Sequence, residues 1–214
     1  LASLRRRGFQ PEAIRRVIYE VGLNPSQALI DWSHLEAFNR KIVDPRANRR
    51  FVVVDPYPLT IKGVPGPLHA EIRLHPDFPE RGVRRFHLSP RNGEVNVFIE
   101  RSDIEGRGKG DLVRLMGLLN IVVEGVGEEA GKALFKDYDV STALKAKAPI
   151  IHWLPSNSNV EVDILWPDAS RKSCLGEKGL LEEGVGSIIQ MERIGYARVD
   201  GIEGERVSLI FSHK

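Results

Sequence analysis

Four polar side chains interrupt an apolar stretch near the end of the sequence, SIIQMERIGYARVDG at residues 187–201. Gln190, Glu192, Arg193 and Arg198 stand at spacings that the two-residue alternation of a strand does not explain. An amide presents a donor and an acceptor together, and a guanidinium presents a fixed fork of donors. Such groups are suited to reading the polar edge of a ligand by hydrogen bonding.

Two plainer interpretations account for the same residues. Gln190 satisfies a bulge in a barrel strand, which the nearby Gly195 favours. Arg193 pairs on the surface with Glu192 or Asp200, an interaction that contributes little to stability. On the pattern alone, these structural interpretations are favoured over a recognition role.

The glycine-rich stretches do not predict a nucleotide site. In EGVGEEAGKAL the spacing to Gly131 and Lys132 does not match a phosphate-binding loop, and Ala133 stands where a metal-binding hydroxyl is required. The glycines of EGRGKGD lack the strand-to-helix context of a dinucleotide fingerprint. We expect both stretches to form turns.

The histidines and the cysteine do not predict a catalytic or metal site either. His69, His75 and His87 have no second ligand at a metal-binding spacing. Cys174 has no histidine arranged to activate it, and we expect His152 to be a structural residue of a barrel. The sequence therefore predicts no catalytic residue and no metal ligand.

Length and composition are those of a globular protein. The 214 residues suffice for one large domain or two to three small ones, with 42% hydrophobic and 28% charged side chains. A single cysteine excludes an internal disulfide framework and fits a cytoplasmic location. No apolar run is long enough to span a membrane. The start, LASLRRRG, lacks both methionine and a signal-peptide core, so we expect a piece of a longer protein.

Positive charge is concentrated at the start of the chain. The net charge is +2, yet the first fifty residues carry ten positive and only five negative side chains. This asymmetry predicts an anionic partner that docks on one side of the molecule. A solvated helical face explains the charge equally well.

The sequence predicts a helical start followed by short strands. Gly8 ends a first helix, Pro11 begins a second, and Ser33 with Glu36 forms a capping box for a third. After Arg50, short β-rich runs alternate with glycine and proline breakers, which favours antiparallel barrels or sandwiches. These runs are FVVVD, LTIK, AEIRL, VNVFIE, LVRLM, NIVV, IIHWL, VEVDIL, SIIQME and RVSLIF. The predicted fold is mainly β with an α-helical N-terminal segment.

Three stretches together resemble one protein family. They are LASLRRRGFQPEAIRRVIYEVGL, LHPDFPERGVRRF and IIQMERIGYARVD, joined by LEAFNRKIVDPRANRRFVVVDP and IIHW at fitting distances. Over essentially its whole length, the chain resembles the C-terminal anticodon-binding half of an archaeal-type glutamyl-tRNA synthetase, which is shared with glutaminyl-tRNA synthetase. HPDFPERG points to the glutamyl branch.

The resemblance implies an architecture and a partner. Residues 1–50 would contact the tRNA stem, residues 51–111 with 187–214 would form a proximal anticodon-binding β-barrel, and residues 112–186 would form a distal barrel inserted in the proximal one. SIIQMERIGYARVDG would be the strand that returns to the proximal barrel beside FVVVDP. The partner would be glutamate tRNA, with glutamine tRNA as a second candidate.

The resemblance also accounts for the missing chemistry. The two ATP-site signatures of the family lie upstream of this region, and SRKSCLG at 170–176 only superficially resembles the second of them. The chain should bind without catalysing and hold no cofactor. The parent would be a class I, ATP-dependent glutamate–tRNA ligase of protein biosynthesis, with a preceding catalytic domain that uses ATP and Mg.

Roles for individual residues follow from the same resemblance. Gln190 matches a glutamine that reads the middle anticodon base, a uridine, whose O4 and N3–H an amide can satisfy at once. Arg49 matches an arginine of the same pocket, and Arg193 matches one near the third base. Arg114 aligns with a basic position toward the first base, although Met116 replaces a second arginine of the glutaminyl branch.

Arg6 and Arg16 are the candidates for phosphate contacts in the basic helical segment. Three alternatives stay open at this point: the same module of a glutaminyl-tRNA synthetase, a stand-alone barrel protein that binds ribosomal RNA, and an enzyme with an unrecognised site. The three-arginine helix and the missing methionine argue against the ribosomal alternative, and no constellation of residues supports the third.

Overall fold

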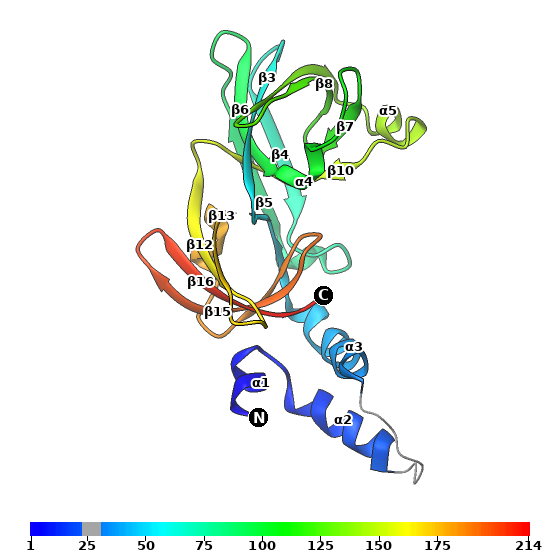
Figure 1. The fold of residues 1–214 in the computed structure, drawn as a ribbon, viewed down its shortest axis with the longest axis vertical. Helices are drawn as coiled ribbons and strands as arrows, with labels where there is room; N and C mark the ends of the chain where they lie inside the picture. Colours follow the sequence, from blue (N-terminus) through cyan, green and yellow to red (C-terminus); the bar gives the residue numbers. More distant parts are fainter. Residues whose placement is uncertain (23–30) are drawn as a thin grey trace.

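The structure is a computed structural model that describes residues 1–22 and 31–214. After a helical segment, the chain forms two seven-stranded sheets, each curled into a nearly closed barrel, and one two-stranded hairpin (Figure 1). One barrel is inserted in the other along the chain. The predicted fold class, mainly β with a helical start and two nested barrels, is therefore confirmed.

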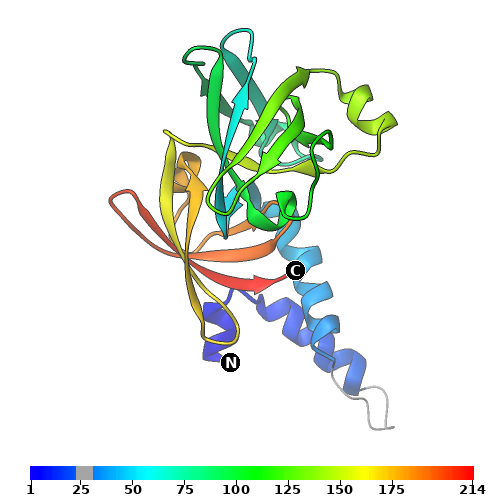
Figure 2. The ribbon, with the colours of Figure 1, turned by 45° about the horizontal axis from the view of Figure 1, so that its top comes forward.

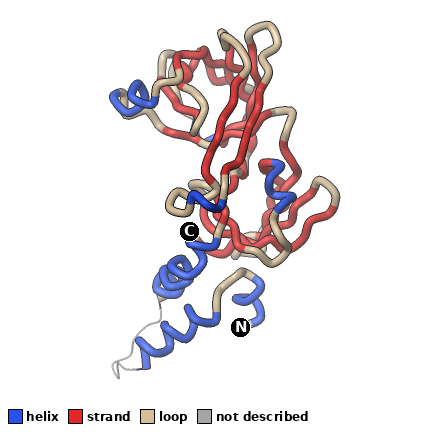
Figure 3. The backbone as a smooth tube through the Cα atoms, turned by 180° about the vertical axis from the view of Figure 1, so that it is seen from behind, coloured by secondary structure: helices blue, strands red, loops and turns tan. Residues whose placement is uncertain are grey.

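Three helices and one 3-10 turn form the N-terminal segment. They are α1 (Ala2–Arg6), α2 (Pro11–Gly22), α3 (Trp32–Val43) and η1 (Asp44–Arg46). Helices α2 and α3 pack against each other around Phe9, Ala13, Val17 and Leu35, which are all buried. Figure 3 shows this segment extending away from the barrels, with the C-terminus beside the end of α3 (Figure 3).

The predicted helix boundaries are confirmed in two cases and wrong in one. Gly8 follows α1 with a φ of 90°, a conformation that glycine adopts most readily, and Pro11 begins α2. Helix α3 is capped by Asp31, whose carboxylate accepts a hydrogen bond from the backbone N–H of Ser33. Ser33 thus lies inside the first turn, because Asp31, two residues earlier, serves as the N-cap.

The proximal barrel is a sheet that closes through one short segment of chain. Its strands in spatial order are β1 (Asn48–Arg50), β14 (Ile188–Met191), β15 (Gly195–Glu203), β16 (Arg206–His213), β12 (Asn159–Leu165), β13 (Arg171–Glu177) and β2 (Val52–Val53). Strands β1 and β2 lie at opposite ends of this order but are separated in sequence only by Phe51. The segment around Phe51 therefore brings both edges of the sheet together.

The distal barrel closes in the same way. Its strands in spatial order are β10 (Ile150–Ile151), β7 (Leu112–Leu115), β8 (Asn120–Val126), β9 (Gly131–Asp137), β3 (Pro56–Lys62), β6 (Glu94–Glu100) and β11 (Trp153–Pro155). His152 separates the two edge strands β10 and β11. The remaining elements are the hairpin β4 (Leu68–Arg73) and β5 (Val83–Leu88), helices α4 (Arg101–Ile104) and α5 (Val140–Lys145), and 3-10 turns η2 (Pro79–Arg81) and η3 (Lys178–Glu182).

The strand pairing corrects the predicted division into barrels. Residues 56–155, and not 112–186, contain all strands of the distal barrel, and residues 48–53 with 159–213 contain those of the proximal barrel. The cause is β3, which pairs with β6 and, in parallel, with β9. The chain therefore re-enters the proximal barrel at β12, before SIIQMERIGYARVDG, and β14 pairs with Asn48–Arg50 just ahead of FVVVDP.

The two closure points pack against each other at the seam between the barrels. The rings of Phe51 and His152 have centroids 5.9 Å apart, and Phe86 and Trp153 pack beside them. Side-chain alternation sends Phe51 and Val53 into the distal core and Val52 into the proximal core. The segment 51–53 thus belongs to both barrels, which lie against each other along it (Figure 2).

Candidate nucleic-acid interface

Strands β1 and β14 bring two of the predicted site residues together. Their parallel register places Arg49 beside Gln190. Ile189 and Met191 point into the proximal core, so the alternation of the strand places Gln190 on the outer face. Arg50 is buried on the opposite face from Arg49. The predicted pair for the middle base therefore forms one outward-facing site.

Both side chains of this pair keep a buried polar atom unused. Nε of Arg49 and Oε1 of Gln190 have no hydrogen-bond partner among residues 1–22 and 31–214. A buried polar atom without a partner costs about 1–3 kcal/mol. The two neighbouring strands thus supply one donor and one acceptor that lack partners, and these are the groups that the O4 and N3–H of uracil require. The bulge considered for Gln190 is not present: β14 pairs with β15 in regular register. The register shifts of β15 lie in its pairing with β16, at Tyr196/Ala197 and Val199/Gly201.

Asp44 and Tyr196 hold the Arg49 side of this site. Nη2 of Arg49 lies 3.5 Å from Oδ1 of Asp44, and the Tyr196 hydroxyl donates to the same carboxylate oxygen. Burial, followed by this hydrogen bond, raises the pKa of Tyr196 well above its usual value. Tyr196 of β15 is paired with Gln190 of β14, and Asp44 lies in η1, just ahead of β1. The two residues therefore support the site from the elements that flank its strands.

Arg193 lies in the tight turn that follows β14 and is bound to the distal barrel. Its backbone is in the left-handed region, with a φ of 67°. Its two terminal nitrogens each lie 2.6 Å from an oxygen of Asp103, and Nη1 lies 3.2 Å from Nδ1 of His152. The surface pairs expected with Glu192 or Asp200 do not form; Asp200 pairs with Arg6 and Arg198.

His152 serves as a neutral acceptor at this point. Burial, and then the charge of Arg193, lower its pKa to about 4. The ring is thus uncharged near neutral pH, and its Nδ1 can accept a hydrogen bond from Arg193. This agrees with the structural role expected for His152, which lies where the distal barrel closes.

Arg114 lies apart from these residues, on strand β7 of the distal barrel, and its neighbours Val113 and Leu115 are the ones that point into the distal core. It is 6% exposed, and its Nη1 donates to the side chain of Asn120 and to the backbone carbonyl of Tyr138. Met116 is partly buried against the distal core. The structure therefore separates the candidate for the first base from the Arg49–Gln190 pair by placing the two on different barrels.

The two helical candidates are exposed. Nη2 of Arg6 pairs with Asp200 at 2.9 Å, and the guanidinium of Arg16 lies 5.6 Å from the centre of the Phe38 ring. A groove of about 900 Å³ runs between the helical segment and the proximal barrel. Its walls include Arg5, Arg6, Arg15 and Arg198, which give this groove a basic lining.

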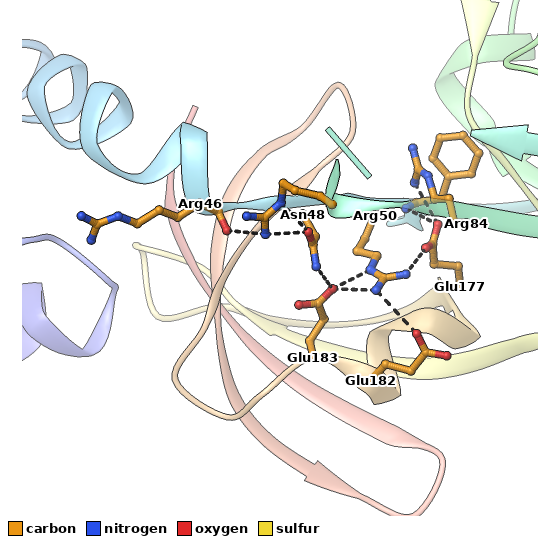
Figure 4. Close-up of polar contacts among 9 residues, drawn as sticks. Arg46, Asn48, Arg50, Arg84, Glu177, Glu182 and Glu183 are labelled. Carbon is orange, nitrogen blue, oxygen red and sulfur yellow. Dashed lines mark hydrogen bonds and ion pairs between the residues drawn. The ribbon is translucent and has the colours of Figure 1, made fainter. Parts of the chain in front are cut away.

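A buried ion network joins the proximal barrel to strand β5 of the hairpin, with Glu177 between Arg50 and Arg84 (Figure 4). Glu177, only 3% exposed, accepts hydrogen bonds from Arg50, Arg84 and the backbone N–H of Phe51. Arg50 also pairs with Glu183, and Arg84 with Glu192. Burial alone would lower the pKa of Arg50, but the charges of Glu177 and Glu183 outweigh it and raise that pKa.

Sequence reasoning missed the members of this network and Asp103. Arg84 comes from the hairpin strand β5 and Glu177 from the end of β13, 93 positions further along the chain. Their pairing depends on the packing of two barrels, which no local pattern encodes. The one usable signal was the resemblance itself, because Arg84 and Glu192 lie within the stretches that carry it.

Neither a metal site nor a membrane span was found in the described part of the chain. Residues 1–22 and 31–214 contain no group of three or more His, Cys, Asp or Glu side chains arranged to hold an ion. No helix within those residues has the length and apolar character to cross a bilayer.

Comparison with known proteins identifies the family. Residues 47–139 and 150–200 each match a family described as "tRNA synthetases class I (E and Q), anti-codon binding domain". The whole chain is 42% identical to a protein of Pyrococcus abyssi and 37% identical to one of Methanopyrus kandleri, both named "Glutamate--tRNA ligase". It spans about 37% of the length of these relatives. The chain therefore belongs to the anticodon-binding domains of the class I tRNA synthetases for glutamate and glutamine, and it is an anticodon-recognition module of the glutamyl-tRNA synthetase type.

Proposed function

We propose that the chain binds glutamate tRNA by receiving unstacked anticodon bases on the outer faces of its two barrels. Gln190 and Arg49 take the middle base, Arg193 takes the third, and Arg114 lies toward the first. The observation that carries this proposal is the pair of unused buried atoms, Arg49 Nε and Gln190 Oε1, on neighbouring strands. Proteins read single-stranded loop bases through such edge contacts.

The hydrogen-bonding pattern of uracil fits this pair. The Gln190 carbonyl oxygen can accept from N3–H, and the Gln190 amide or Arg49 can donate to O4. A cytosine at the same place offers an unprotonated N3 and an amino group, so its acceptor and donor are exchanged. The site therefore favours uridine at the middle position.

The test is binding of the chain to glutamate tRNA and to a variant with cytidine at the middle anticodon position. We expect Gln190→Ala to reduce the preference for uridine by about 1–3 kcal/mol, as base-edge contacts do. Asn157→Ala, which removes an exposed amide from a loop, is the matched control and should leave the preference unchanged. An equal loss of affinity for both tRNAs would show that Gln190 supports folding or backbone binding only.

Arg6 and Arg16 are proposed to contact phosphates. We expect Arg6→Ala to weaken binding of every anticodon variant by the same factor and to reduce the salt slope of binding by about one unit. The measurement is the dissociation constant over a series of salt concentrations. Arg206→Ala removes another exposed, ion-paired arginine and serves as the control. An unchanged slope for Arg6→Ala would place this side chain away from the RNA backbone.

The parent protein is proposed to be an ATP-dependent glutamate–tRNA ligase of the cytoplasm, in which a catalytic domain supplies the ATP and Mg chemistry. The names of the relatives and the 37% of their length that the chain spans support this proposal. The presence of one cysteine fits a reducing compartment, and burial raises the thiol pKa of Cys174 to about 12. The chain's own part in the reaction is to bind and orient the tRNA.

A further inference from the structure

We propose that Asp103 is a positioning residue for anticodon recognition, which acts by orienting the guanidinium of Arg193 toward the third base. This rests on the role of Arg193 proposed above. Asp103 comes from helix α4 of the distal barrel, whereas Arg193 belongs to the proximal barrel, 90 positions away in the chain. A residue of one barrel thus sets the direction of a reading group on the other.

The contact between the two residues has the geometry of a fixed fork. Both terminal nitrogens of Arg193 donate to Asp103, each at 2.6 Å, so the guanidinium plane cannot rotate without breaking one bond. Nδ1 of His152 lies 3.2 Å from Nη1 and accepts the second hydrogen of that nitrogen. Three of the five N–H donors of Arg193 are then engaged.

The remaining donors define what Arg193 can read. Nε–H and the second hydrogen of Nη2 have no partner among residues 1–22 and 31–214, and the side chain is 36% exposed. These two donors lie along one edge of the guanidinium, an edge that matches two neighbouring acceptors on a base. Asp103 occupies the Nη1–Nη2 edge of the Arg193 guanidinium and therefore leaves the Nε–Nη2 edge available to the RNA.

Asp103 is itself well anchored. The neighbouring Ile104 is fully buried in the distal core, and Nε of Arg107 donates to the backbone carbonyl of Asp103 at 2.6 Å. The turn that carries Arg193 is held at a second point, because the adjacent Glu192 pairs with Arg84 of the hairpin. Two ion pairs thus fix this turn, one from Arg193 to Asp103 of the distal barrel and one from Glu192 to Arg84 of the hairpin.

The test compares Asp103→Asn with wild type for binding of glutamate tRNA and of variants substituted at the third or at the middle anticodon position. The asparagine keeps the shape of the side chain but turns an amide donor toward Arg193. We expect the preference for the native third base to fall about tenfold, as for one lost base-edge contact, while the preference at the middle base stays unchanged. Asp103→Glu, which keeps the carboxylate, should lose less.

Glu105→Gln is the matched control for charge. Glu105 is exposed two positions after Asp103, and its replacement also removes one negative charge near the RNA. On electrostatics alone, both variants would bind every tRNA more tightly. A loss of third-base preference in Asp103→Asn, but not in Glu105→Gln, therefore identifies an effect on orientation.

Two further variants separate the possible failures. If Arg193→Ala keeps the full third-base preference, the proposed role of Arg193 is wrong and the positioning role fails with it. If Arg193→Ala loses that preference and Asp103→Asn keeps it, only the positioning role is overturned. The double variant should be no worse than Arg193→Ala alone. An additive loss of third-base preference in the double variant, or an equal loss of preference at the middle base, would show that Asp103 is merely structural. Unfolding midpoints are measured for each variant to check that it is folded.

Discussion

Replacing Glu177 with alanine is expected to lower the free energy of unfolding by about 3–5 kcal/mol, because it removes the buried carboxylate that two buried arginines share. Glu177 is the carboxylate shared by Arg50 and Arg84, whose side chains are 5% and 3% exposed. It also accepts the backbone N–H of Phe51, where the proximal barrel closes. The loss therefore affects the seam between the barrels as well as the ion network.

Urea or thermal unfolding of the chain measures this effect. The control is Glu182→Ala, because Glu182 also faces Arg50, at 4.0 Å, but is 81% exposed. Exposed ion pairs contribute about 0–1 kcal/mol, so this control should be nearly as stable as wild type. Equal stability of the two variants would mean that Glu177 does not compensate the buried arginines.

Acid is expected to destabilise the chain through His152. The pKa of this residue is lowered from 6.5 to about 4 in the folded state, first by burial and then by Arg193. Between these values the unfolded chain binds a proton that the folded chain does not, so the free energy of unfolding falls as the pH is lowered. The full effect, from about pH 6.5 to about pH 4, is on the order of 3 kcal/mol.

The contribution of His152 to this pH dependence is isolated by comparing wild type with His152→Gln, whose amide oxygen can still accept a hydrogen bond from Arg193. Burial also lowers the pKa of His213, and that residue titrates in both proteins, so it cancels from the difference. Across this pH range, the slope of the free energy of unfolding against pH should be smaller in the variant, by the equivalent of up to one bound proton. Identical slopes would mean that His152 is protonated in the folded state as readily as in the unfolded one.

The sequence predicted much of the fold because local signals mark it. Gly8 and Pro11 bound their helices as expected, and each of the ten β-rich runs contains or overlaps a strand. Strands β1, β5, β9, β13 and β15 lie outside these runs. In β13, for example, the first three residues are exposed and polar, and its pairing with β12 and β2 defines it.

The barrel boundaries were less predictable because they depend on pairing between distant segments. Val52 packs in the proximal core, while Phe51 and Val53 pack in the distal core, so this run of apolar residues cannot be assigned to one barrel. The parallel pairing of β3 with β9 joins residues about seventy positions apart. Neither feature leaves a periodic trace in the sequence.

The candidate site was predictable only in part, because it too depends on pairing between distant segments. Resemblance suggested that Arg49 and Gln190 share one pocket, and strand pairing places them side by side. The residues that hold the site, such as Asp103 and Glu177, are ordinary carboxylates in sequence and gain their role only from arginines brought close by the fold.

The most direct measurement concerns the N3–H group of the middle anticodon uridine. Dissociation constants are measured for glutamate tRNA carrying uridine or N3-methyluridine at that position, with wild type and with Gln190→Ala. If Gln190 accepts a hydrogen bond from N3–H, methylation should weaken wild-type binding by about 1–3 kcal/mol and weaken Gln190→Ala binding much less. Equal penalties in both proteins would contradict recognition of the base edge by Gln190.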